Sequence, residues 1–209
     1  MSLAIPVDDE VSLRLVAPEH AEEITAVARA NVEYVGRWLP WCTEKYDVEG
    51  CRAWALSSLR GFGERKQLPL SVLEHGRVVG GCGINDWRQQ TNADWDHAVA
   101  WGEIGYWLAE DATGRGIVTR CVRRLLDYAF DEIGLERMVI RVEPDNARSR
   151  AVPERLGFTC EGTSRRVAVW KGRPVDMRVY SMLADEWRAA AGQPAENQLP
   201  PGGGGVSNR

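Results

Sequence analysis

The chain has 209 residues, of which 44% are hydrophobic and 27% are charged, enough to bury one sizeable core. This composition favours one ordinary globular domain over a repeat array or a disordered protein. The formal net charge is -4, so the chain lacks the basic excess that binding to a phosphate backbone requires. We therefore expect no direct nucleic-acid partner.

The cysteines and the pattern of apolar residues narrow the possible classes of protein further. Five cysteines are scattered and none is spaced as CxxC, which indicates neither a disulfide framework nor a zinc site, and favours a reduced, cytoplasmic protein without a metal. The first residues show no basic region followed by an apolar stretch, and no run approaches the roughly 18 apolar residues of a membrane helix. We expect neither export nor membrane insertion.

The first half of the chain predicts a strand, two helices and a hairpin. Apolar residues alternate over 11–15 as in a half-buried strand, and a helical pattern follows over 18–28. A second helical pattern over 47–62 begins with an aspartate cap. Two apolar runs, 68–74 and 78–85, flank a His-Gly pair and predict an antiparallel hairpin.

The middle of the chain predicts a crossover between two parallel strands. A polar stretch over 86–97 leads into a long strand through 104–108, then a glycine loop and a helix over about 119–133. The β-branched run 137–142 predicts the next strand. A strand, loop, helix and strand in this order imply a parallel pair at that point.

The C-terminal part predicts a short helix over 148–156 and a closing hairpin of two strands, 159–169 and 175–183. We therefore expect an α/β (α+β) fold: a mixed, mostly antiparallel sheet of about seven strands with a central parallel pair, flanked by about four helices. The domain is predicted to span 1–188, because 189–209 is too polar and glycine-rich to pack.

The glycine loop Gly114-Arg115-Gly116 lies between the predicted strand and the helix that follows. Backbone amides of such a loop can approach a diphosphate closely, and the N-terminus of the helix adds positive potential. The loop matches neither GxGxxG nor the P-loop pattern. By itself it indicates either an anionic cofactor or a mere tight turn.

The surrounding sequence carries a family resemblance. EIGYWLAEDATGRGIVTR (103–120) followed by EPDNARSRAVPERLGF (143–158) resembles the acetyl-CoA motif of GNAT N-acetyltransferases, specifically the RimJ/RimL-type branch that acetylates ribosomal-protein N-termini. The WLPW segment (38–41) and the closing YSMLADEW (180–187) are also similar to that branch. The resemblance covers about residues 11 to 188 and implies the GNAT fold and acetyl-CoA as cosubstrate.

The resemblance also implies the cofactor contacts. Backbone groups of Trp107, Leu108 and Ala109 would hold the pantetheine arm as an added strand, and Asn146 with Ser149 would hold pantetheine or adenosine-side groups. The residues that would cradle the diphosphate are Gly114, Arg115, Gly116, Ile117, Val118 and Thr119.

The sequence departs from the family pattern at three positions. Thr113 and Val118 stand at the first and last positions of the motif Gln/Arg-x-x-Gly-x-Gly/Ala, and relatives in this branch commonly carry a bulky aliphatic residue at the last one. Pro153 stands where many members carry the tyrosine that protonates the departing thiolate. The resemblance therefore names no general acid for this chain.

Glu103 is the candidate general base. Strand alternation puts it on the same face as Gly105 and Trp107, near the region where the thioester would lie. A solvated or salt-bridged strand glutamate is the alternative. An α-amine, with a pKa near 7.7 to 8.0, costs only about 1 to 1.4 kcal/mol to deprotonate at pH 7, against roughly 4.6 for lysine, so a weak base suffices for an N-terminus.

Other side chains have two interpretations each. Trp38 and Trp41 would either wall the acceptor groove or merely pack. Cys121 lies at a helix start, where the dipole would lower its pKa, yet a packed cysteine is the commoner case. Tyr180 would either donate a proton or pack. A set of arginines would meet the cofactor's 3'-phosphate or only the solvent: Arg148, Arg150, Arg155, Arg165 and Arg166.

The predicted reaction is direct attack of a primary amine on acetyl-CoA in a ternary complex, with a protein or peptide N-terminal α-amine as the acceptor. An acetyltransferase of a small amine (amino sugar, polyamine or amino-acid-like metabolite) is a second hypothesis, and the acidic residues of the polar stretch 86–97 leave it open. A catalytically inactive acyl-CoA sensor is the third, suggested by Pro153. A homodimer is expected only by analogy with the branch.

Overall fold

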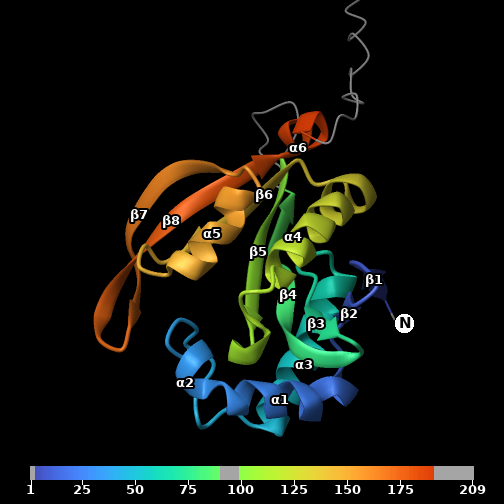
Figure 1. Cartoon of the computed structure of the whole chain (residues 1–209), viewed down its shortest axis with the longest axis vertical. Helices are drawn as coiled ribbons and strands as arrows, with labels where there is room; N and C mark the ends of the chain where they lie inside the picture. The colour runs from blue at the N-terminus through green and yellow to red at the C-terminus, as the bar shows by residue number, and fades with distance from the viewer. Residues whose placement is uncertain (1–2, 90–98, 191–209) are drawn as a thin grey trace, which may run out of the picture.

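The strands form one mixed sheet in the order β1-β2-β3-β4-β5-β6-β8-β7 (Figure 1). The computed structural model describes residues 3–89 and 99–190. Within these ranges β5 and β6 are parallel and all other neighbouring strands are antiparallel. The strands are β1 (Ala4–Pro6), β2 (Val11–Leu15), β3 (Leu70–Glu74), β4 (Arg77–Gln89), β5 (Ala100–Leu108), β6 (Arg137–Val142), β7 (Thr159–Trp170) and β8 (Arg173–Leu183).

Helices cover both faces of the sheet. α4 and α5 lie across one face in Figure 1, whereas α1 packs on α3 and β4. The helical elements are η1 (Pro18–His20), α1 (Ala21–Ala30), α2 (Val32–Val35), α3 (Val48–Gly63), η2 (Glu110–Ala112), α4 (Ile117–Asp127), η3 (Tyr128–Ile133, a π-helical extension of α4), α5 (Ala147–Arg155) and α6 (Ala184–Ala190).

Alternation along β5 decides which side chains meet which helices. Ile104 and Leu108 belong to the main core, which includes Cys121 and Leu125 of α4. Trp107 instead packs against the two smaller clusters formed with α1 and α3. The odd-numbered residues of β5 therefore face the α1–α3 side, and the even-numbered residues face α4 and α5.

Local signals produced the elements that the sequence predicts. The Asp47 carboxylate accepts a hydrogen bond from the Gly50 amide at 2.7 Å and caps α3. Two hairpin turns place two successive residues at positive φ, His75-Gly76 (47° and 78°) and Lys171-Gly172 (50° and 74°), as a two-residue type I′ turn requires. The mixed sheet with its parallel pair is confirmed.

Several elements differ from the sequence prediction. The sheet has eight strands rather than about seven, and β1, α2 and α6 were not predicted, since three to seven residues give too little periodicity to detect. β4 extends to Gln89, into the stretch interpreted as polar, because β5 offers it a partner from Gly80 to Gln89. The rest of that stretch and the predicted tail from 191 onward lie outside the described residues, and the domain boundary at 188 stays a prediction.

Candidate active site

A gap opens between β5 and β6. Their parallel pairing is confined to three pairs, Trp101↔Arg137, Gly102↔Met138 and Glu103↔Val139. Beyond Glu103, β5 continues to Leu108 along β4, whereas β6 continues along β8. The two strands therefore separate toward their C-terminal ends, and within the described residues the inner edge of β5 has no neighbouring strand there.

The free edge of β5 can accept an added strand. The Ala109 amide donates to the Val79 carbonyl at 2.8 Å, which directs the main chain of that residue toward β4. Because main-chain groups alternate along an antiparallel strand, those of Tyr106 and Leu108 face the gap. Of the three residues expected along the pantetheine arm, Leu108 has its main chain toward the gap, whereas the main chains of Trp107 and Ala109 face β4.

The loop after β5 is shaped for an anion. Gly114 and Gly116 have φ of +79° and +72°, and a Cβ at either position would meet nothing within 4 Å. Glycine is therefore needed there for its conformation and not for space. α4 begins at Ile117 with no side chain capping it, so the amides of its first turn, which includes Val118 and Thr119, are free to bind a diphosphate.

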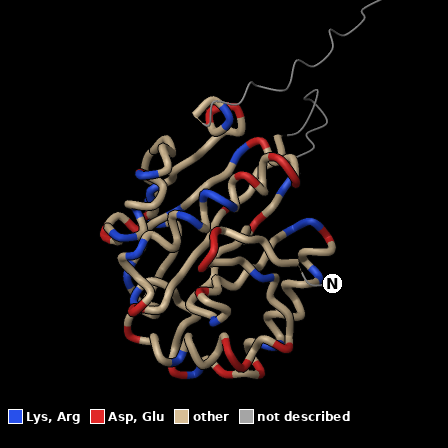
Figure 2. The backbone as a smooth tube through the Cα atoms, turned by 45° about the vertical axis from the view of Figure 1, so that its right-hand side comes forward, with Lys and Arg blue, Asp and Glu red and all other residues tan. Residues whose placement is uncertain are grey.

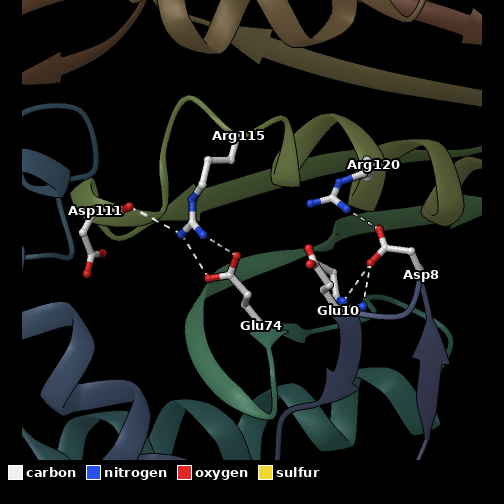
Figure 3. A network of polar contacts seen from close by, with 7 residues as sticks. Asp8, Glu10, Glu74, Asp111, Arg115 and Arg120 are labelled. Carbon is white, nitrogen blue, oxygen red and sulfur yellow. Dashed lines mark hydrogen bonds and ion pairs between the residues drawn. The ribbon is translucent and has the colours of Figure 1, made fainter.

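Arg115 supplies backbone, and not a free cation, to this loop. Its guanidinium donates to both carboxylate oxygens of Glu74 at 2.6 and 3.0 Å and to the Asp111 carbonyl at 3.4 Å (Figure 3). Arg120, one turn into α4, similarly pairs with Asp8 at 2.5 Å. These ion pairs hold the loop and the helix start against β3 and the β1–β2 turn.

The start of α5 is tied to β5 by a pair of hydroxyl groups that sequence reasoning missed. The Tyr106 hydroxyl donates to the Ser149 carbonyl at 2.9 Å, and the Ser149 hydroxyl donates to Tyr106 Oη at 3.1 Å. The Asn146 side chain accepts from the Ser149 amide at 3.2 Å and caps α5. Burial raises the pKa of Tyr106, so its phenol stays protonated. Pro153 is buried within α5.

The opposite face of the gap carries aromatic side chains. The rings of Trp41 and Trp107 meet edge to face, with centroids 5.5 Å apart, and Trp41 also lies 5.1 Å from the ring of Tyr46. Trp41 is 38% exposed and can contact a ligand. The ring of Trp38 instead lies 5.2 Å below the Arg37 guanidinium. The structure thus joins one of the two predicted acceptor tryptophans to the β5 edge.

Glu103 lies at the vertex of the gap, in an ion pair. Arg141 Nη2 of β6 donates to Glu103 Oε2 at 2.5 Å, and the Glu103 side chain is 16% exposed. Asn85 is the extra residue of a β-bulge in β4 beside this position. A Cβ on Gly105 would lie only 2.0 Å from the Asn85 side-chain nitrogen, so glycine there makes room for Asn85. No sequence signal distinguishes this bulge.

The other candidate residues either lie outside the gap or are buried in the core. Burial raises the pKa of Cys121 to about 12 and overrides the effect of the nearby helix start. Tyr180 is buried and donates to Glu154 at 3.0 Å. Three of the five arginines, Arg148, Arg150 and Arg155, lie on α5, where Arg148 donates to Tyr34 and Arg150 pairs with Glu154, and Arg165 and Arg166 lie on β7.

Comparison with known proteins identifies the family. The family profile described as the acetyltransferase (GNAT) domain matches residues 10–159. The chain belongs to the GNAT family. It is an acetyl-CoA-dependent N-acetyltransferase with a GNAT fold. In the described ranges no cluster of His, Cys, Asp and Glu could hold a metal ion, and no helix is long and apolar enough to cross a membrane.

Three relatives within the GNAT family illustrate its range. The chain is 33% identical to the putative ribosomal N-acetyltransferase YdaF of Bacillus subtilis, over 87% of this chain and 95% of that one. It is 23% identical to the ribosomal-protein-serine acetyltransferase of Escherichia coli, over 88% and 99%. The solved structure of the microcin C7 self-immunity acetyltransferase MccE, in complex with acetyl-CoA and AMP, superposes with a TM-score of 0.76 at 26% identity, over 85% and 94%.

Proposed function

We propose that this enzyme transfers the acetyl group of acetyl-CoA to the N-terminal α-amine of a protein or peptide. The observation that carries the proposal is the gap between β5 and β6, open toward a face that bears Trp41, Trp107 and Glu103. Two relatives matched over almost their whole length are named for ribosomal substrates, which supports a ribosomal protein as the acceptor.

The cofactor fits the residues on the α4 side of the gap. Leu108 and Tyr106 offer main-chain groups to the pantetheine arm, and the loop from Gly114 to Thr119 offers amides to the diphosphate. When bound, acetyl-CoA supplies the activated acyl group. Asn146 and Ser149 lie at the start of α5, beside Tyr106, where they would position the arm.

Acetylation of an α-amine requires only a weak base. Deprotonating an α-amine at pH 7 costs about 1 to 1.4 kcal/mol, against roughly 4.6 kcal/mol for lysine. One oxygen of Glu103 accepts from Arg141, so the amine, or a water that relays its proton, would use the other oxygen. The Tyr106–Ser149 hydroxyl pair holds the start of α5 against β5. A thiol has a pKa of about 8.5, so the departing thiolate is stable near neutral pH and needs no dedicated acid in place of the tyrosine missing at Pro153.

A small-molecule amine is the second candidate acceptor. MccE, a self-immunity acetyltransferase of the same fold, was solved in complex with acetyl-CoA and AMP, which supports a small molecule as the acceptor. A small acceptor would fill the space beside Trp41 and make no contact beyond the gap. We also propose a cytoplasmic location, in keeping with the free thiols; a homodimer stays a prediction.

A thiol-release assay with acetyl-CoA tests the proposal. The acceptors are peptides with free N-termini, N-terminally blocked peptides that carry lysine, and a panel of small amines. We expect turnover of the free N-termini and at least about 10-fold less of the lysine peptides at pH 7, because of the difference in amine pKa. Turnover of a small amine alone would refute the proposed acceptor and favour the second candidate.

A further inference from the structure

The outer half of the β7–β8 hairpin has no third strand beside it in the part of the chain that the structure describes. β8 pairs with β6 over Arg178–Leu183 only, so residues 173–177 pair with β7 alone. Figure 1 shows this ribbon projecting from the body of the molecule. An isolated two-stranded ribbon is marginally stable, and this one is held to the domain at Val175, which is 2% exposed.

The ribbon is mainly cationic. Residues 163–177 contain four cationic residues and one acidic one, Asp176, although the whole chain has a net charge of -4. Elsewhere Lys and Arg are interspersed with Asp and Glu along the backbone (Figure 2). Arg173 pairs with the buried Glu143 at 2.9 Å. Arg165, Arg166 and Lys171 are exposed and have no acidic partner among the residues described.

A wide bulge presents two of these cations. Ser164 pairs with Met177 and Ala168 with Val175, so three residues of β7 lie opposite one residue of β8. Arg166 adopts φ of +52°, and its amide donates to Asp176 Oδ1 at 2.8 Å. Bulges re-aim side chains, and strained non-glycine conformations are concentrated at functional sites. The bulge thus displays Arg165 and Arg166 next to Val167, which is 45% exposed.

The bulge lies on the side toward which the gap opens. Ser181 of β8 pairs with Val139, which pairs with Glu103 at the vertex. Counting back along β8 from Ser181 leads toward the open end of the gap. Asp176, which lies opposite the bulge, is five residues from Ser181, about 17 Å at the rise of a strand. An extended acceptor with its amine at Glu103 would bring roughly its fifth to ninth residues to the bulge.

We propose that Arg165, Arg166 and Lys171, named here the basic bulge, dock an acidic segment of the protein acceptor. The inference rests on the proposed function, since a small amine has no such segment. Guanidinium groups bind carboxylates in a bidentate fashion, and complementary charge outside the reacting centre raises the association rate and selects the partner. The substrate class is therefore a protein whose free N-terminus is followed by a run of Asp or Glu.

Kinetics with matched peptides test the docking. Peptides of about twelve residues share their first four residues and carry Glu, Gln or Lys at positions five to nine. We expect kcat/KM of the Glu peptide to exceed that of the Gln peptide about 3- to 10-fold, through KM. The double variant Arg165→Ser/Arg166→Gly should remove this preference, and so should about 1 M salt, where the Debye length is about 3 Å.

A control variant carries the same changes elsewhere. Arg60 and Arg65 are exposed at the end of α3, and Arg65 also has a positive φ, 56°. Arg60→Ser/Arg65→Gly therefore removes the same charge and relieves a similar backbone strain. We expect this variant to keep the preference for the Glu peptide. A folding defect would instead lower the melting temperature and the turnover of all peptides alike.

Fluorescence anisotropy separates docking from turnover. The probe is a labelled Glu peptide with a blocked N-terminus, and we expect wild type to bind it more tightly than the Arg165→Ser/Arg166→Gly variant does. Equal kcat/KM for the Glu and Gln peptides in wild type would overturn the docking and leave the proposed function standing. Turnover of no peptide would refute the proposed function itself. Tighter binding of a labelled RNA oligomer than of the Glu peptide would also overturn an acidic protein as the occupant.

Discussion

The two sides of the gap between β5 and β6 are made of different groups. On the α4 side the binding groups are backbone: the positive-φ glycines Gly114 and Gly116, the free amides of the first turn and the main chain of Leu108. On the other side they are side chains, such as Trp41 and Glu103, that come from separate segments. In the proposed function, the backbone groups would bind the cofactor, and the side chains would decide which acceptor is used.

The largest effect should come from Gly116→Val. Valine at φ of +72° costs about 2 kcal/mol or more, or it shifts the loop. We expect the dissociation constant for CoA, measured by calorimetry, to rise about 30-fold or more. Gly134→Val is the control, because Gly134 has φ of +81° and equally open space but lies far from the loop in sequence. An equal loss of CoA affinity in both variants would show that the loop conformation is not specific.

Glu103→Gln should lower kcat about 100-fold and leave CoA affinity unchanged. The amide keeps the size of the side chain and can still accept from Arg141, which now pairs with the carboxylate. Steady-state kinetics with a peptide acceptor and calorimetry with CoA measure the two effects. If Glu103 only holds the strands together, the variant will lower the melting temperature while kcat falls less than about 3-fold.

Trp41→Ala should raise KM for the acceptor about 5- to 30-fold, since a buried aromatic anchor contributes roughly 1 to 2 kcal/mol. The dissociation constant for CoA should not change, because Trp41 meets the side chain and not the main chain of β5. Trp38→Ala removes the same surface from the same segment without the contact to Trp107. Equal KM values for the two variants would contradict the role that we propose for Trp41.

The smallest effect concerns the thiols. Cys121 lies in α4, but burial raises its pKa to about 12, so it stays protonated at pH 8 and is an unreactive thiol. Cys160 is the exposed cysteine, and the other four are buried. We expect Ellman's reagent to modify one thiol rapidly in the native protein and none in Cys160→Ser. Rapid modification of any thiol in the native Cys160→Ser variant would mean that at least one of the four buried cysteines becomes readily accessible to the reagent.

The sequence by itself determined the backbone side of the site. The capped helix α3, both hairpin turns and the crossover from β5 to β6 follow from a residue's own conformational preference or from its nearest neighbours. The glycine loop is of the same kind, because positive φ and a helix start are local properties. The family resemblance then named the anion that such a loop binds.

Only the tertiary structure decided which side chains meet on the other side of the gap. Trp41 and Trp107 meet across 66 positions of the chain, and Tyr106 meets Ser149 across 43. Arg115 was expected only in the diphosphate cradle, yet its guanidinium pairs with Glu74. Such contacts depend on strand register, and a shift of one residue would turn every side chain to the opposite face. The bulge at Asn85 makes such a shift within β4, and no local preference of the sequence specifies it.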